Sequence, residues 1–108
     1  MLQLLRKSEQ ALVIEFTIPK IYSANAEDLK LALAPYLKKD IQVYLSLKQV
    51  SFMDSSAIGL IISTMRKAIQ NNSELFLTDC QASTLALFDL VKLNKVVNIV
   101  KSHTELKI

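Results

Sequence analysis

An aspartate and two serines, Asp54-Ser55-Ser56, stand at the most informative point of the chain. A short apolar segment, residues 50–53, precedes them, and an apolar stripe at helical spacing follows from Ala57. This change of pattern places two hydroxyls and a carboxylate at a helix start, where backbone N–H groups are unpaired and the macrodipole is positive. Such a position can hold a phosphate group. Alternatively, Asp54 simply caps the helix, which spacing alone favours.

The rest of the sequence offers few residues that could act in catalysis. The only histidine, His103, lies near the C-terminal end, and the sequence suggests no carboxylate or serine partner for it, so we expect an exposed or loosely packed residue. A single glycine excludes a phosphate-binding Walker loop and a dinucleotide fingerprint. The sequence around Ser55 is not a nucleophile elbow. Cys80 stands alone, which excludes an internal disulfide and a thiolate metal cluster. We therefore expect no enzyme activity, no metal and no cofactor.

Charge and hydropathy limit the partners. The formal net charge is +3, but the basic residues occur singly or in pairs among acidic ones, so we expect no nucleic-acid binding. No apolar run approaches the roughly 20 residues of a membrane helix, and the polar N-terminal residues lack a signal-peptide core. Together with the single cysteine, these features predict a cytoplasmic protein that does not bind membranes.

The hydrophobic pattern predicts one α/β domain over residues 1–108. We expect strands over residues 2–7, 11–18, 41–47, 74–78 and 96–100. Helical periodicity covers residues 24–37, 57–69 and 83–90, with Ser23 as an N-cap and a kink or an early end at Pro35. Residues 104–108 add a short helix or an extended end. Strands that alternate with helices indicate a mixed, mostly parallel sheet of about five strands with three to four helices.

A phosphate on a serine at this helix start would act mainly on partners. It adds a charge of about −1.5 to −2 at pH 7. The helix N-terminus stabilises that charge by about 0.3–1 kcal/mol, while the adjacent Asp54 repels it by a comparable amount, so the fold should survive. A partner surface packed against this turn would instead face a desolvated dianion, at a cost of several kcal/mol.

The segment 50–59, Val-Ser-Phe-Met-Asp-Ser-Ser-Ala-Ile-Gly, resembles the signature of STAS domains, specifically the bacterial anti-sigma factor antagonists. The resemblance implies a binding protein whose partner is an anti-sigma factor that is also a serine kinase of the histidine-kinase-like ATPase group. The unphosphorylated antagonist captures this kinase. The kinase then phosphorylates the serine after the signature aspartate, here Ser55, and a PP2C-type phosphatase reverses the reaction.

We assign the partner-binding surface to six residues around this turn: Met53, Asp54, Ser55, Ser56, Ser23 and Asn25. Met53 is equally compatible with a buried strand end, and Ser23 and Asn25 with capping or turn positions. A second hypothesis remains open, because residues 21–27 look closer to STAS domains attached to sulfate-type transporters. In that case the chain is a non-switching subunit, or a regulator of a transporter, biofilm or secretion pathway.

Overall fold

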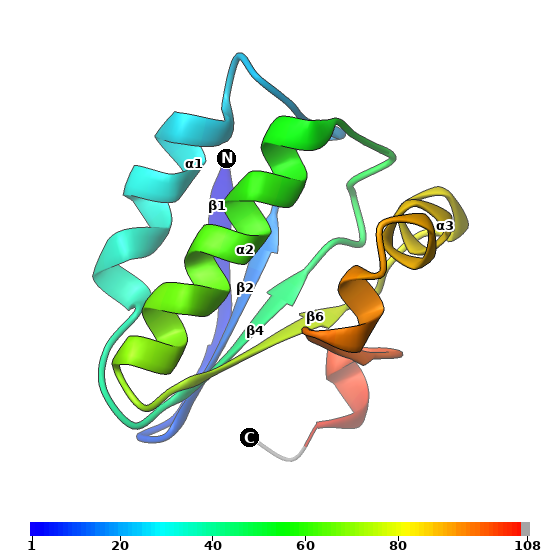
Figure 1. Ribbon diagram of the computed structural model, residues 1–108. Helices are drawn as coiled ribbons and strands as arrows, with labels where there is room; N and C mark the ends of the chain where they lie inside the picture. Colours follow the sequence, from blue (N-terminus) through cyan, green and yellow to red (C-terminus); the bar gives the residue numbers. More distant parts are fainter. Residues whose placement is uncertain (107–108) are drawn as a thin grey trace.

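The computed structural model describes residues 1–106 and builds them around a five-stranded sheet (Figure 1). The strand order across the sheet is β1-β2-β4-β6-β7. The bounds of these strands are β1 Leu2–Lys7, β2 Ala11–Phe16, β4 Gln42–Ser46, β6 Glu74–Thr78 and β7 Asn98–Val100. β1 pairs antiparallel with β2, and the other neighbours pair parallel. The predicted mixed, mostly parallel sheet is confirmed.

β2 is buried along its whole length. All six of its residues are buried, as expected of a strand with neighbours on both sides and cover on both faces. A second, small sheet is formed by β3 (Lys20–Ile21) and β5 (Phe52–Met53), which pair parallel. β3 was not predicted, because two residues are too few to show a strand pattern. Its pairing with β5 brings the loop before the first helix next to the Asp54 turn.

Helices α1 (Ala26–Leu33) and α2 (Ser55–Gln70) lie side by side on one face of the sheet (Figure 1). α3 (Ala82–Leu90) lies beside the β6 and β7 edge. The predicted break at Pro35 is confirmed: α1 ends at Leu33 and continues as a short 3-10 turn, η1 (Ala34–Tyr36). Two further 3-10 turns, η2 (Leu93–Lys95) and η3 (His103–Glu105), flank β7.

The main core lies between the sheet and the helices. Its largest fully buried side chains include Phe16, Phe88, Ile61 and Leu29. A smaller cluster occupies the other face of the sheet, where the Tyr44 and Phe76 rings stack with centroids 4.5 Å apart. The two clusters explain why β2 is apolar on both faces.

The segment after β7 is fastened to the sheet, contrary to our expectation for His103. The Arg6 guanidinium donates hydrogen bonds to the His103 and Leu106 carbonyl oxygens at 2.8 and 2.9 Å. The His103 backbone N–H donates to the Asp79 carboxylate at 3.1 Å, and the imidazole Nε2 lies 4.0 Å from the same oxygen. His103 therefore has a carboxylate partner that sequence spacing does not reveal. Residues 107–108 of the predicted tail element lie outside the described residues.

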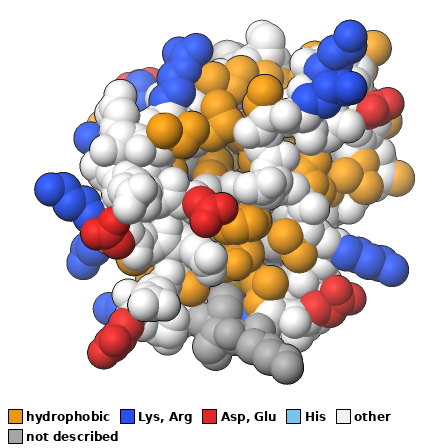
Figure 2. All heavy atoms as spheres, turned by 60° about the horizontal axis from the view of Figure 1, so that its bottom comes forward, with side chains coloured by type: hydrophobic (Ala, Val, Ile, Leu, Met, Phe, Trp, Pro, Cys, Tyr) orange, Lys and Arg blue, Asp and Glu red, His pale blue; other side chains and the backbone are white. Residues whose placement is uncertain are grey.

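Charged side chains are dispersed over the face of the molecule that Figure 2 shows. Figure 2 shows the end of the molecule at the bottom of Figure 1, where hydrophobic side chains spread over the centre. Lys and Arg side chains stand apart around its edge, with Asp and Glu among them. Among the described residues, no helix is long and apolar enough to span a membrane.

Candidate functional site

The Asp54 carboxylate organises the start of α2. Its Oδ1 accepts hydrogen bonds from the backbone N–H groups of Ser56 and Ala57, at 2.9 and 3.2 Å. Asp54 is thus the N-cap of α2, as its sequence position predicts. Its Oδ2 accepts a further hydrogen bond from the Ser23 backbone N–H at 3.1 Å. One side chain therefore caps α2 and holds the loop that leads into α1.

Ser55 is the first residue of α2, and its side chain is exposed. Within residues 1–106 the structure shows no hydrogen bond from its hydroxyl. Ser56 is half-buried, and its backbone N–H is already used by Asp54. Of the two serines, Ser55 is the more exposed residue at the helix N-terminus.

Asn25 and Ser23 lie in the loop beside this turn, and Asn25 has the capping and turn position that its sequence context also allowed. Asn25, not Ser23, occupies the N-cap position of α1, and no side chain caps the helix. The Asn25 amide instead closes its own loop: Oδ1 accepts from the Tyr22 N–H at 3.0 Å, and Nδ2 donates to the Lys20 carbonyl at 2.8 Å. The predicted Ser23 N-cap is wrong because α1 begins at Ala26, two residues later than expected.

Met53 does not present its side chain on this surface. It is 8% exposed and belongs to the main core, which corrects its place among the partner contacts. Its neighbour Phe52 is 49% exposed. Successive residues of a strand point to opposite faces, so only one of the two can face the core. That alternation is the signal that sequence reasoning missed.

A basic and aromatic cluster surrounds Phe52. The Lys20 ammonium lies 4.2 Å from the centroid of the Tyr22 ring and 5.1 Å from that of the Phe52 ring. The β3–β5 pairing, with Lys20 opposite Phe52, brings these residues together. The ring quadrupoles attract the ammonium group by about 0.5–1 kcal/mol at an exposed site. Phe52, Tyr22 and Lys20, which we name the aromatic cluster, form a surface beside the Asp54 turn.

A buried carboxylate in β2 anchors the loop between β4 and β5. Glu15, 8% exposed at the end of β2, accepts hydrogen bonds from the Ser46 hydroxyl at 2.8 Å and the Gln49 amide at 3.0 Å. From α3, the Ser83 hydroxyl donates to the Ser51 carbonyl at 3.1 Å. These contacts fix the loop that delivers β5 and Asp54 to the surface.

Two titratable side chains, Asp79 and Cys80, directly follow β6. Burial raises the pKa of the Cys80 thiol to about 11, with a further contribution from the Asp79 charge, so the thiolate is scarce at neutral pH. Burial alone would raise the pKa of Asp79. The hydrogen bonds it accepts from His103 N–H and from the Thr78 and Ser102 side chains outweigh that effect and lower it. Within residues 1–106, no group of three or more His, Cys, Asp or Glu side chains is placed to hold a metal ion.

Comparison with known proteins assigns the family. The STAS domain model matches residues 4–106, so the chain belongs to the STAS domain family. An anti-sigma-B factor antagonist of Staphylococcus aureus is 30% identical over 57 residues, which are 53% of this chain and 53% of that protein. The match thus spans about half the length of that relative. The anti-sigma-B factor antagonist of Bacillus subtilis is 28% identical over 79 residues, 73% of this chain and 71% of that protein.

A solved structure gives the same fold. An anti-sigma-factor antagonist (STAS) domain protein from Planctomyces limnophilus superposes with a TM-score of 0.84 at 15% identity. The superposition covers 96% of this chain and 92% of that one. The resemblance drawn from residues 50–59 is confirmed at the level of family and fold.

Proposed function

We propose that this protein is an anti-sigma factor antagonist that works by partner switching. In its unphosphorylated form it binds an anti-sigma factor that is also a serine kinase of the histidine-kinase-like ATPase group. Phosphorylation of Ser55 by that kinase releases the complex, and a PP2C-type phosphatase restores the binding form. The protein itself acts by binding and not as an enzyme. Because the proposed kinase uses ATP, we propose that it works in the cytoplasm.

The observation that carries this proposal is the exposure of Ser55 at the N-terminus of α2. A kinase must reach the hydroxyl without opening the core, and the position of Ser55 meets that requirement. Asp54 supports it, since its carboxylate is already bound to the N–H groups of Ser56, Ala57 and Ser23. Those dipoles offset part of its charge, so the repulsion of a neighbouring phosphate is reduced.

The aromatic cluster supplies the partner contact in this proposal. Exposed aromatic side chains are common anchors of protein interfaces, because they bury a large area with few rotamers to fix. Phe52 stands three positions before Ser55, at the same turn. A partner that covers Phe52 would also desolvate the Ser55 side chain. A phosphate there would then be desolvated in the interface next to the Asp54 carboxylate, which costs several kcal/mol and opens the complex.

The test is intact-mass analysis after incubation with ATP and the ATPase-type serine kinase encoded nearest to this protein. The proposal predicts addition of one phosphoryl group to the parent chain and to Ser56→Ala, but not to Ser55→Ala. Phosphorylation of Ser55→Ala, or of none of the three proteins, would contradict it. Ser56→Ala is the matched control, because it removes a hydroxyl from the adjacent residue of the same turn.

A further inference from the structure

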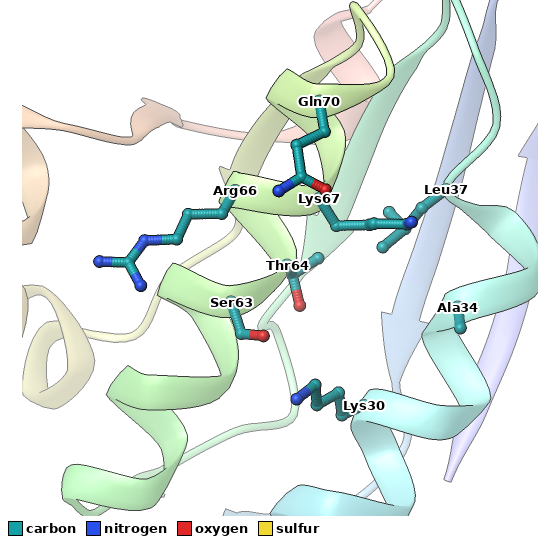
Figure 3. Close-up of a pocket in the computed structure, with 8 residues that line it drawn as sticks. All are labelled: Lys30, Ala34, Leu37, Ser63, Thr64, Arg66, Lys67 and Gln70. Carbon is teal, nitrogen blue, oxygen red and sulfur yellow. The ribbon is translucent and has the colours of Figure 1, made fainter.

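A groove of about 390 Å³ lies between α1 and α2, well along both helices from Ser55 (Figure 3). Its floor contains Ala34, Leu37 and Thr64, of which Leu37 and Thr64 are buried. The Thr64 hydroxyl donates to the Leu60 carbonyl within α2 at 2.8 Å, so it is not free for a ligand. The floor is therefore largely apolar, and its volume lies in the range of small-molecule sites.

The groove exists because the two helices differ in length. Pro35 ends α1 at Leu33, whereas α2 continues to Gln70. The last turns of α2 consequently face only the short η1 turn and the small side chain of Ala34, which leaves space between the two segments. No other element fills this space in the described part of the chain.

Two lysines reach into the groove from opposite sides. In Figure 3 the Lys30 ammonium extends from α1 toward the Ser63 hydroxyl on α2, and the Lys67 ammonium extends from α2 toward Leu37. Arg66 belongs to the same lining, but its guanidinium points away from α1. No acidic side chain lines this groove, and neither lysine forms an ion pair within residues 1–106. Two positive charges on the walls of an apolar groove create a positive potential suited to an anion.

We propose that this groove binds a small organic anion with an apolar body. Its carboxylate or phosphate head lies between Lys30 and Lys67, where the Ser63 hydroxyl can donate a hydrogen bond. Its apolar part packs on Ala34 and Leu37. An isolated inorganic ion would leave that floor uncovered, and an uncharged lipid would leave the two ammonium groups unpaired.

The groove continues toward the proposed phosphorylation site. A second hollow shares Lys30 and Ser63 with it and extends along α2 past Gly59 to Ser56. A Cβ built on Gly59 meets no atom within 4 Å, so this part of α2 is open. A ligand in the groove would lie against both helices whose N-terminal ends form the Ser55 surface. The binding site itself does not depend on the proposed switch.

The test is an NMR titration of the full chain, in which backbone amide shifts are followed with four probes: octyl phosphate, octanoate, octanol and inorganic phosphate. We expect saturable shifts at Lys30, Ala34, Ser63 and Lys67 with octyl phosphate, octanoate or both. Octanol and inorganic phosphate should bind about tenfold more weakly or not at all. The difference between octyl phosphate and octanoate identifies the head group. Octanol binding equal to that of the anions, or no saturable shift with any probe, would overturn the proposal.

Variants that remove positive charges distinguish a specific binding site from nonspecific electrostatic attraction. Lys30→Gln combined with Lys67→Gln should weaken octyl phosphate or octanoate binding by about tenfold or more. Arg66→Gln is the matched control for each single lysine variant, since it removes one positive charge from the same lining but from a side chain that points away. Ala34→Phe should block the groove without changing any charge. All these positions are exposed, so the amide spectra should keep their native dispersion. If Arg66→Gln and the single lysine variants weaken binding of these anions equally, the binding reflects nonspecific charge attraction. That result would overturn the proposal.

Discussion

The Asp54 carboxylate binds the Ser23 backbone N–H, 31 positions earlier in the chain, at 3.1 Å. Its other oxygen caps α2, so a single side chain joins the loop before α1 to the start of α2. The turn that carries Ser55 is therefore held by one charged group. This geometry makes the turn rigid while leaving the Ser55 hydroxyl free.

Replacing Asp54 should destabilise the protein. Asp54→Ala removes the α2 cap and the bond to Ser23, and we expect a loss of about 1–2 kcal/mol in the free energy of unfolding. Urea denaturation followed by circular dichroism measures it. Asp54→Asn should lose less, because the amide oxygen can still cap α2, although the amide NH2 group cannot accept from the Ser23 N–H. Glu9→Ala, in an exposed turn, is the control. An Asp54→Ala protein as stable as Glu9→Ala would contradict the role of the cap.

Glu15 should matter for the loop beneath the site. Glu15→Ala leaves the Ser46 hydroxyl buried without its partner, and the Gln49 amide also loses its acceptor. We expect a loss of about 1–3 kcal/mol, measured in the same denaturation experiment. Glu15→Gln keeps the volume and one acceptor oxygen, so it should lose less. Equal stability of Glu15→Ala and the parent chain would show that the loop holds without this carboxylate.

Phe52 should be an anchor for the proposed partner. Phe52→Ala removes a half-exposed ring from the aromatic cluster, and we expect binding of the kinase partner to weaken by about tenfold or more, or about 1.4 kcal/mol. Isothermal titration calorimetry measures it. Ile69→Ala is the control, because Ile69 is an apolar side chain 64% exposed in the last turn of α2. It lies roughly 20 Å along α2 from Ser55. If Ile69→Ala weakens binding as much as Phe52→Ala does, the interface lies elsewhere.

Asp79 should give the protein an acid-dependent stability. Its pKa in the folded state is below the ordinary value. The stabilisation is thus fully present above about pH 4, the unfolded value, and is lost as the pH falls through the lower folded pKa. Asp79→Asn should reduce this loss of stability at acid pH, because asparagine does not titrate. It also tolerates the left-handed backbone at this position, where φ is 55°. Thermal unfolding from pH 2.5 to 7 tests this, and parallel acid limbs in the two proteins would refute it.

The sequence predicts much of the fold because its signals are local. The continuous apolar run of β2, the proline that ends α1 and the aspartate that caps α2 each act within a few residues. What sequence reasoning missed depends on contacts between distant segments. The Asp54 carboxylate accepts a hydrogen bond from the Ser23 N–H, and the Asp79 carboxylate accepts one from the His103 N–H, 24 positions later in the chain. The burial of Met53 and exposure of Phe52 follow from a two-residue strand whose orientation is set only by its pairing with β3.

The central claim is that a phosphate on Ser55 opens a complex without unfolding the protein. The most direct measurement is calorimetric titration of the kinase partner with the unphosphorylated chain and with the chain phosphorylated at Ser55, each checked by circular dichroism. The account predicts saturable binding of the unphosphorylated chain, no measurable binding of the phosphorylated chain, and the same spectrum for both. Equal affinity of the two forms, or a phosphorylated chain that has lost its native spectrum, would contradict it.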